Sequence, residues 1–87
     1  MNTNNLPFNK WSQERIKQGR KFCTSRSKRY SDPRVFMIIK MPLGVVKEYL
    51  WELEGANSKG EFERVWLTIH QDFNSQKEVY VHFGDFR

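Results

Sequence analysis

The 87 residues are enough for one domain, residues 1–87, of which the polar residues 1–6 are expected to be loosely ordered. There is no run of about 18 apolar residues, no signal-peptide pattern and only one cysteine, so we expect no membrane span and no disulfide framework, and a cytoplasmic setting. The net charge is +5, but residues 1–47 carry eleven Lys and Arg against two Asp and Glu, whereas residues 48–87 carry four against eight, which favours a polyanionic partner.

The first half of the chain predicts one helix and two strands. A short helix is expected over residues 9–19, where Asn9 or Ser12 can cap the start and Gly19 can end it. A β-leaning run follows over residues 22–27.

The loop after that run ends in the turn signal Ser31-Asp32-Pro33. The apolar run over residues 35–39 is continuous, which is typical of a strand buried on both faces, and Pro42 ends it.

The second half predicts two helices and a final strand. One helix closes at Gly55, and the other begins at Ser58, which with Glu61 has the spacing of a capping box. Their apolar stripes are Val46, Tyr49, Leu50 and Leu53 in the first, and Phe62, Val65, Trp66 and Ile69 in the second. Alternation over residues 79–83 indicates the strand, with His82 on its polar face. The order of elements makes α+β the expected fold class, and so few strands leave sheet edges to be covered.

Basic residues, hydroxyls and aromatics are concentrated between Gly19 and Arg34. Phosphates bind Lys, Arg and hydroxyl donors, and bases stack on aromatic or guanidinium planes, so this segment favours RNA or a nucleotide over a solvated hairpin. The residues expected to contact the nucleic acid are Arg20, Lys21, Arg26, Lys28, Arg29 and Arg34.

Other candidate groups have simpler interpretations. Glu61 is either the capping-box carboxylate of its helix or a carboxylate that pairs with a lysine in a cleft. Cys23 is expected to be a small strand residue rather than a nucleophile. One cysteine and two distant histidines do not have the spacing of a zinc site, so no metal or other cofactor is expected.

Several motifs together resemble the ASCH domain, a branch of the PUA-like superfamily, over about residues 8–83. The most telling is Gly19-x-Lys21-x-x-Thr24-x-Arg26. It is preceded by Trp11-Ser12-x-Glu14-Arg15-Ile16 and followed by Pro42-Leu43-Gly44, Glu61-Phe62-x-x-x-Trp66-x-x-Ile69-His70 and Val79-Tyr80-Val81-His82-Phe83.

The resemblance implies a small PUA-like mixed β-barrel, or an open curved sheet, flanked by three helices and with a cleft beside it. Members of the family are thought to bind RNA or modified nucleotides. Some resemble amidohydrolases that deacetylate N4-acetylcytidine, or a ribonuclease. Carried over, the catalytic set would be Lys21, Thr24 and Glu61, with Arg26 binding the ligand in the same cleft. Lys21 and Thr24 can converge only if Lys21 precedes the strand, because their spacing is odd.

The chain departs from the family after Pro33, where a turn and a strand that the family usually has are missing. The shortened sheet, together with Trp51, which falls off the stripe of its helix, predicts a homodimer. Three hypotheses follow: an RNA- or nucleotide-binding module, a small hydrolase acting on a modified nucleoside or a nuclease, and a dimeric scaffold that has lost the site.

Overall fold

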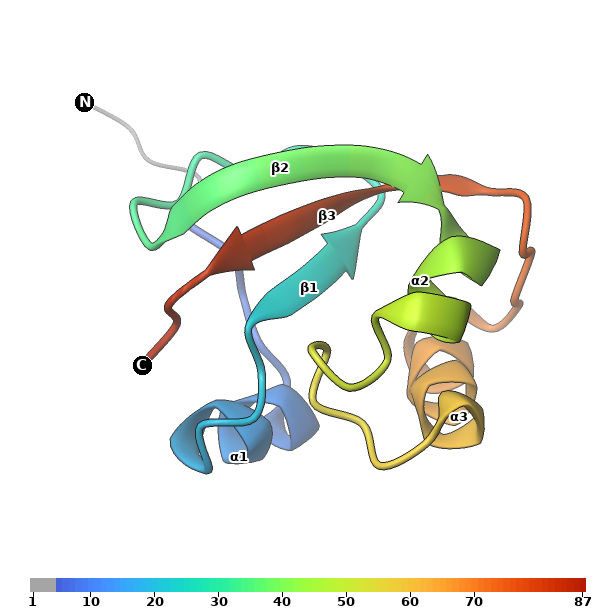
Figure 1. Ribbon diagram of the computed structural model, residues 1–87, viewed down its shortest axis with the longest axis horizontal. Coiled ribbons are helices and arrows are strands. Elements are labelled where there is room, and N and C mark those ends of the chain that lie inside the picture. Colours follow the sequence, from blue (N-terminus) through green and yellow to red (C-terminus); the bar gives the residue numbers. More distant parts are fainter. Residues whose placement is uncertain (1–4) are drawn as a thin grey trace.

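A computed structural model describes residues 5–87 and has an α+β fold, as expected. Within these residues the chain forms three helices and three strands, in the order helix, strand, strand, helix, helix, strand (Figure 1). In chain order they are α1 (Lys10–Lys17), β1 (Cys23–Arg26), β2 (Val35–Pro42), α2 (Leu43–Tyr49), α3 (Lys59–His70) and β3 (Glu78–Gly84). The longest of these helices, α3, has 12 residues, and none within residues 5–87 is long and apolar enough to cross a bilayer.

The three strands form one open, antiparallel sheet in the order β1-β3-β2. The last strand of the chain therefore lies in the centre, between two strands that do not pair with each other (Figure 1). Cys23 and Met37 both lie opposite Phe83, and a register shift between Val35 and Met37 marks a bulge in β2. Of the two expected sheet forms, the open sheet is the one found, and neither strand pairing is parallel.

The prediction that residues 35–39 are buried on both faces is wrong. β2 is an edge strand, and Phe36, Met37 and Ile39 are 76%, 44% and 40% exposed. The central strand, with a paired strand on each side, is β3, and its residues Val79 and Val81 have no exposed surface. A continuous apolar run marks a strand that needs covering, but it does not say which strand of the sheet is central.

Two apolar clusters hold the helices against the sheet. The larger joins α2 and α3 to β1 and β3; its buried members are Cys23, Leu43, Val46, Ala56, Phe62, Trp66, Val79 and Val81. Trp51 packs against this cluster within its own chain, so it is not left over as a second contact surface. The smaller cluster consists of Leu6, Ile16 and Phe86 and fixes α1 to the other end of the sheet.

The ends of the elements depend on local hydrogen bonds. The side chain of Asn9 accepts the Ser12 N–H at 2.8 Å and caps α1, and Gly19 follows that helix with φ of 71°. The expected loose segment lies partly outside the described residues, at 1–4; within it, Leu6 is 3% exposed and its N–H donates to Asp32 at 2.9 Å, so the expectation fails for Leu6.

The helix predicted to reach Gly55 ends instead at Tyr49. The chain then turns so that the Leu53 carbonyl accepts the N–H groups of Phe22, at 2.7 Å, and Cys23, at 3.2 Å. Tyr49 and Leu53, which the helical pattern placed in the apolar stripe, are 76% and 40% exposed. The turn covers the free edge of β1 and brings the next residue, Glu54, into the interior.

Candidate functional site

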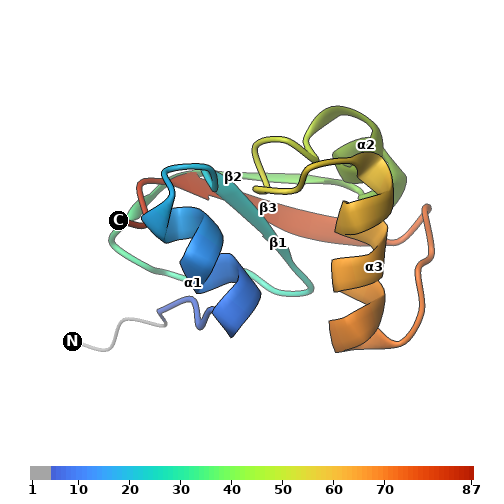
Figure 2. The ribbon, with the colours of Figure 1, turned by 90° about the horizontal axis from the view of Figure 1, so that it is seen from below.

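A cavity of about 530 Å³ lies between α1 and α3, with β1 at its base. Figure 2 shows the two helices on either side of β1. Polar groups line the base and one rim, namely Lys21, Thr24, Ser25, Arg26, Ser27, Lys28 and Glu54, and aromatic and aliphatic groups line the walls, among them Phe8, Trp11, Tyr30, Phe62, Val65, Trp66 and Ile69. This volume is in the range of small-molecule sites, which run from about 300 to 1,000 Å³.

A buried ion pair forms the base of the cavity. The Lys21 ammonium donates to a carboxylate oxygen of Glu54 at 3.2 Å and to the Glu54 backbone carbonyl at 2.9 Å. The second carboxylate oxygen of Glu54 accepts the Ser25 hydroxyl at 2.7 Å. Both charged side chains are almost fully buried, 3% exposed for Lys21 and 5% for Glu54. Burying two charges is costly unless they are paired and hydrogen-bonded, and these two meet both conditions.

Lys21 and Thr24 line the same cavity because Lys21 precedes β1, which begins at Cys23. Their odd spacing would place them on opposite faces of a regular strand, and the position of Lys21 before the strand avoids this. Thr24 is buried, and its hydroxyl oxygen lies 3.5 Å from Nε of Arg26, at the outer limit of a hydrogen bond.

Glu61 does not lie in the cavity, so the expected set of three residues is not brought together. Its backbone N–H donates to the Ser58 hydroxyl at 3.0 Å, which is the capping interaction, and its carboxylate accepts the Asn57 N–H at 2.7 Å. The other carboxylate oxygen pairs with Arg15 at 3.4 Å. The capping interpretation of Glu61 is confirmed, with Asn57 rather than Ser58 as the backbone donor to the carboxylate.

Glu54 occupies the place that Glu61 was expected to take, and the sequence analysis missed it. One signal could have found it. Glu54 is four residues after Leu50, so in the predicted helix its carboxylate falls on the apolar side, where a charge needs a partner.

Arg26 and Lys28 form the cationic rim of the cavity. Arg26 lies over two aromatic rings, with its guanidinium carbon 5.4 Å from the centre of Phe8 and 5.5 Å from that of Tyr30, and it donates to the Pro7 carbonyl at 2.5 Å. Burial lowers the pKa of Arg26 from its ordinary value, with Tyr30 opposing that effect. Lys28 is exposed, and its ammonium lies 5.1 Å from the centre of the Tyr30 ring. Planar groups and positive charge therefore occur together on this rim.

The opposite wall is supplied by α3. Phe62 and Trp66 belong to the core, but Val65 is only partly buried and Ile69 is 55% exposed, and both line the cavity. The His70 ring stacks on Trp66 with ring centres 4.0 Å apart. Burial and the nearby charge of Lys77 lower the pKa of His70, which favours its neutral form beside the indole.

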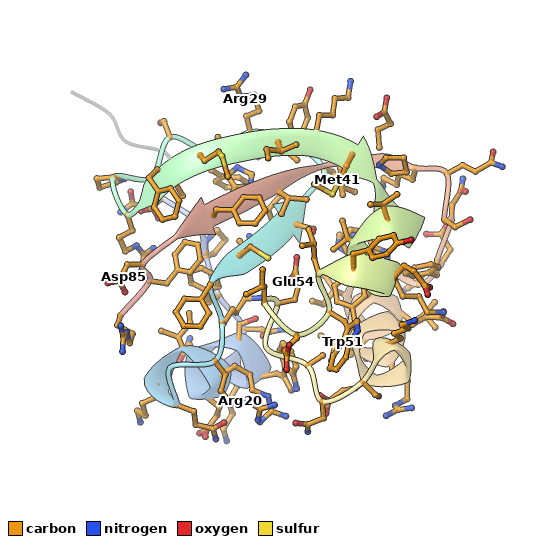
Figure 3. All side chains as sticks on the ribbon, in the orientation of Figure 1. Arg20, Arg29, Met41, Trp51, Glu54 and Asp85 are labelled. Atoms are coloured by element: carbon orange, nitrogen blue, oxygen red, sulfur yellow. The ribbon has the colours of Figure 1, made fainter. Side chains whose placement is uncertain are left out.

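Three of the six predicted nucleic-acid contacts lie elsewhere. Arg20 bonds to Asn57 and lines a different hollow beside Trp51, and Arg29 lies across the sheet from it (Figure 3). Arg34 forms two side-chain bonds to Asp32, at 2.9 and 2.6 Å, which lower the pKa of that carboxyl group. Arg34 thus fixes the chain before β2, and only Lys21, Arg26 and Lys28 of the predicted set line the cavity.

His82 and Cys23 are structural. His82, expected on a polar face, has no exposed surface because the loop at Tyr30 covers it. Burial in the core raises the pKa of the Cys23 thiol, which leaves it without nucleophilic character. Among residues 5–87 no group of three or more His, Cys, Asp or Glu side chains is arranged to hold a metal ion.

Comparison of the chain with protein-family models, with curated proteins and with solved structures finds no match.

Proposed function

We propose that the protein binds RNA or a nucleotide, with a nucleobase in the cavity between α1 and α3 and phosphate on the rim formed by Arg26 and Lys28. The observation that carries the proposal is the composition of one cavity, which has aromatic and aliphatic walls, a hydrogen-bonding base and a cationic rim. A base needs a planar apolar slot with a few polar partners, and its phosphate needs cations at the slot's mouth. The lining of this cavity contains aromatic and aliphatic groups, polar groups and cations.

The ASCH and PUA-like resemblance belongs to the same proposal. Its support is that the Lys, Thr and Arg of the Gly19-x-Lys21-x-x-Thr24-x-Arg26 motif line one cavity, although they come from the loop before β1 and from β1 itself. The open three-stranded sheet is compatible with a shortened form of that fold.

The test is the binding of a fluorescently labelled single-stranded RNA to the wild type and to two arginine variants. Arg26→Ala is expected to weaken binding about 10- to 100-fold, because a charge-assisted hydrogen bond contributes about 1.5–3 kcal/mol. Arg20→Ala removes the same charge from a different hollow and serves as the matched control, for which affinity is expected to change little.

Salt provides the second readout. Two rim cations on a single strand predict a slope of log affinity against log salt of about −1.4, from about −0.7 for each phosphate contact. The proposal fails if RNA and mononucleotides do not bind at low salt, or if the Arg20 and Arg26 variants weaken binding equally.

A second candidate is the hydrolysis of an acetylated nucleoside such as N4-acetylcytidine, because Thr24 shares the cavity with the Lys21–Glu54 pair. In this arrangement Glu54, not Glu61, supplies the carboxylate. The Thr24 hydroxyl would attack the acetyl carbon, the amide C–N bond would break as the nucleoside amine takes up a proton, and water would then cleave the acetyl ester to release acetate.

Chromatography of N4-acetylcytidine incubated with the protein tests this second candidate. The wild type is expected to release cytidine, and Thr24→Val is expected to lose this activity. The control variant Thr68→Val is expected to keep it, because Thr68 is an exposed threonine on α3 outside the cavity. If the wild type releases no cytidine, the hydrolase proposal fails for this substrate, and the binding proposal is unaffected.

A further inference from the structure

The outer edge of β2 is long and has no neighbouring strand among residues 5–87. The eight-residue strand pairs with β3 on one side only, and in Figure 1 it forms the upper margin of the sheet. An edge strand of this length leaves backbone N–H and C=O groups free to pair with another strand. The other edge is protected, since β1 has four residues and the Leu53 carbonyl accepts the N–H of Cys23 at its start.

The free edge is also the margin of the apolar core. Met37, Ile39 and Met41 lie opposite Phe83, Val81 and Val79 in the register, so they share the face of the sheet that carries the core. Met41 packs against the core cluster, but Met37 and Ile39 are 44% and 40% exposed. A partner that pairs with β2 would therefore cover apolar surface as well as backbone groups.

The pattern of β2 fits a second copy of the same strand. On the core face residues 37–41 read Met-Ile-Met, which is the same in both directions from Ile39. Antiparallel pairing about a two-fold axis at Ile39 places Ile39 opposite its own copy and Met37 opposite Met41 of the other chain. The bulge between Val35 and Met37 lies outside this stretch.

The charges are compatible with that pairing. Lys40 is the only charged residue of β2, and in this register it lies opposite Ile38 rather than opposite another lysine. Its ammonium is 5.6 Å from the ring centre of Tyr80 in its own chain, so the charge already has an aromatic partner.

We propose that two copies of the chain pair antiparallel along β2, about a two-fold axis at Ile39, and form one continuous six-stranded sheet. This surface is separate from the cavity between α1 and α3, because none of residues 35–42 lines that cavity. The proposal therefore stands or falls independently of nucleotide binding.

Light scattering and sedimentation from micromolar to millimolar concentration test the association. The wild type is expected to approach twice its chain mass of 10.5 kDa. Ile39→Lys places two lysines opposite each other at the axis and is expected to weaken association at least tenfold. Leu67→Lys adds the same charge at a residue of similar exposure, 37%, on α3, and is expected to dimerise like the wild type.

Cross-linking tests the register without requiring that a charged variant fold. Under mild oxidation Ile39→Cys is expected to form a disulfide between chains, whereas Leu67→Cys is not, and the native Cys23 is buried. A strictly monomeric wild type, equal association of the two lysine variants, or equal cross-linking of the two cysteine variants would overturn the proposal.

Discussion

At the scale of single residues, Lys21 and Glu54 form an ion pair in the interior of the protein. Nearly all of both side chains is removed from water, in a chain too short to bury a large core. The pair is satisfied by three hydrogen bonds, from Lys21 to the carboxylate and the carbonyl of Glu54 and from Ser25 to the carboxylate. Its stability depends on both partners being present.

We expect Lys21→Met to lower the free energy of unfolding by about 3–5 kcal/mol, because it leaves the buried Glu54 carboxylate without its cation. The double variant Lys21→Met/Glu54→Gln is expected to be more stable than Lys21→Met alone, since it removes the orphaned charge. Urea denaturation of the wild type, Lys21→Met, Glu54→Gln and the double variant measures the coupling free energy between the two side chains. Additive effects of the two substitutions would show that the pair is not formed.

His82 links stability to pH. Its Nε2 accepts the Tyr30 N–H at 2.9 Å, so Nδ1 carries the proton and faces the Tyr80 carbonyl at 3.0 Å. Burial lowers the pKa of His82, and the charges of Arg26 and Arg29 act in the same direction. A proton on Nε2 would break the bond that holds the loop at Tyr30 over the sheet.

The folded-state pKa of His82 lies below its ordinary value of 6.5, so the unfolded chain takes up the proton first as pH falls. The stabilisation is therefore complete above about pH 6.5 and is lost as pH falls toward the folded pKa, with a slope of at most about 1.4 kcal/mol per pH unit. Unfolding at pH 7.5 and 5.5 measures it. His82→Gln is expected to reduce the difference between the free energies of unfolding at the two pH values. The control His70→Gln is expected to retain the part of that difference that is due to His82. Equal pH profiles for the wild type and His82→Gln would contradict this assignment.

Residue identities in the site were partly predictable from the sequence. The ASCH resemblance placed Lys21, Thr24 and Arg26 in one cleft, and these three residues, which are close together in the chain, do line one cavity. Glu54 was not predicted, because its position depends on where α2 ends and on a loop that returns to β1. The place of Arg34 outside the cavity was not predicted, because its partner Asp32 is only two residues away and a close pair in a basic segment does not stand out.

At the scale of the elements, Gly84 allows β3 to approach β2 closely at the end of the sheet where β2 begins and β3 ends. A Cβ on Gly84 would lie 2.4 Å from the Arg34 carbonyl oxygen and 3.1 Å from Cα of Val35. Neither atom can rotate away, because both belong to the backbone. The same carbonyl also accepts the Asp85 N–H, at 3.2 Å.

Gly84→Ala is expected to lower the free energy of unfolding by about 1–3 kcal/mol through this overlap. Gly60→Ala is the matched control. Its Cβ, in the first turn of α3, would lie 3.5 Å from the flexible end of Arg64 and 3.8 Å from the Ser58 hydroxyl oxygen, which are ordinary contact distances. A change of less than about 1 kcal/mol in the stabilising direction is therefore expected. Thermal unfolding of both variants checks the contrast, and equal stabilities would show that the strands can shift apart.

The positions of most helices and strands could be predicted from local sequence signals, whereas the burial of each element could not. The capping pair of Ser58 and Glu61 locates the start of α3, and the alternation over residues 79–83 locates β3. The burial of β2 was predicted wrongly because it depends on the strand order, which is set by pairing between distant segments. The end of α2 was also missed, since the Leu53 carbonyl bonds to the N–H groups of Phe22 and Cys23, which are distant in the sequence, and not to a later residue of its own helix.

At the scale of the whole molecule, the fold joins the basic and acidic halves of the chain. Within residues 5–87, three ion pairs link the basic half of the chain to the acidic half, namely Arg15 with Glu61, Lys21 with Glu54 and Lys47 with Glu63. Part of the charge asymmetry is thus balanced inside the protein. Arg26 and Lys28, at the rim of the cavity, belong to none of these three pairs, so their charge supports the proposed binding of a polyanion there.

The central position of β3 has a consequence for how the chain folds. Neither outer strand can form a hairpin with the other, and even the closest ladder contact, Pro42 with Glu78, spans both α2 and α3. Closing such long loops costs entropy before any strand contact compensates for it, and contacts of high sequence separation slow folding. The sheet therefore assembles late and around the last strand. Until β3 docks, β1 and β2 are two unpaired strands exposed to any neighbour, so the same topology that organises the native sheet makes its folding sensitive to protein concentration.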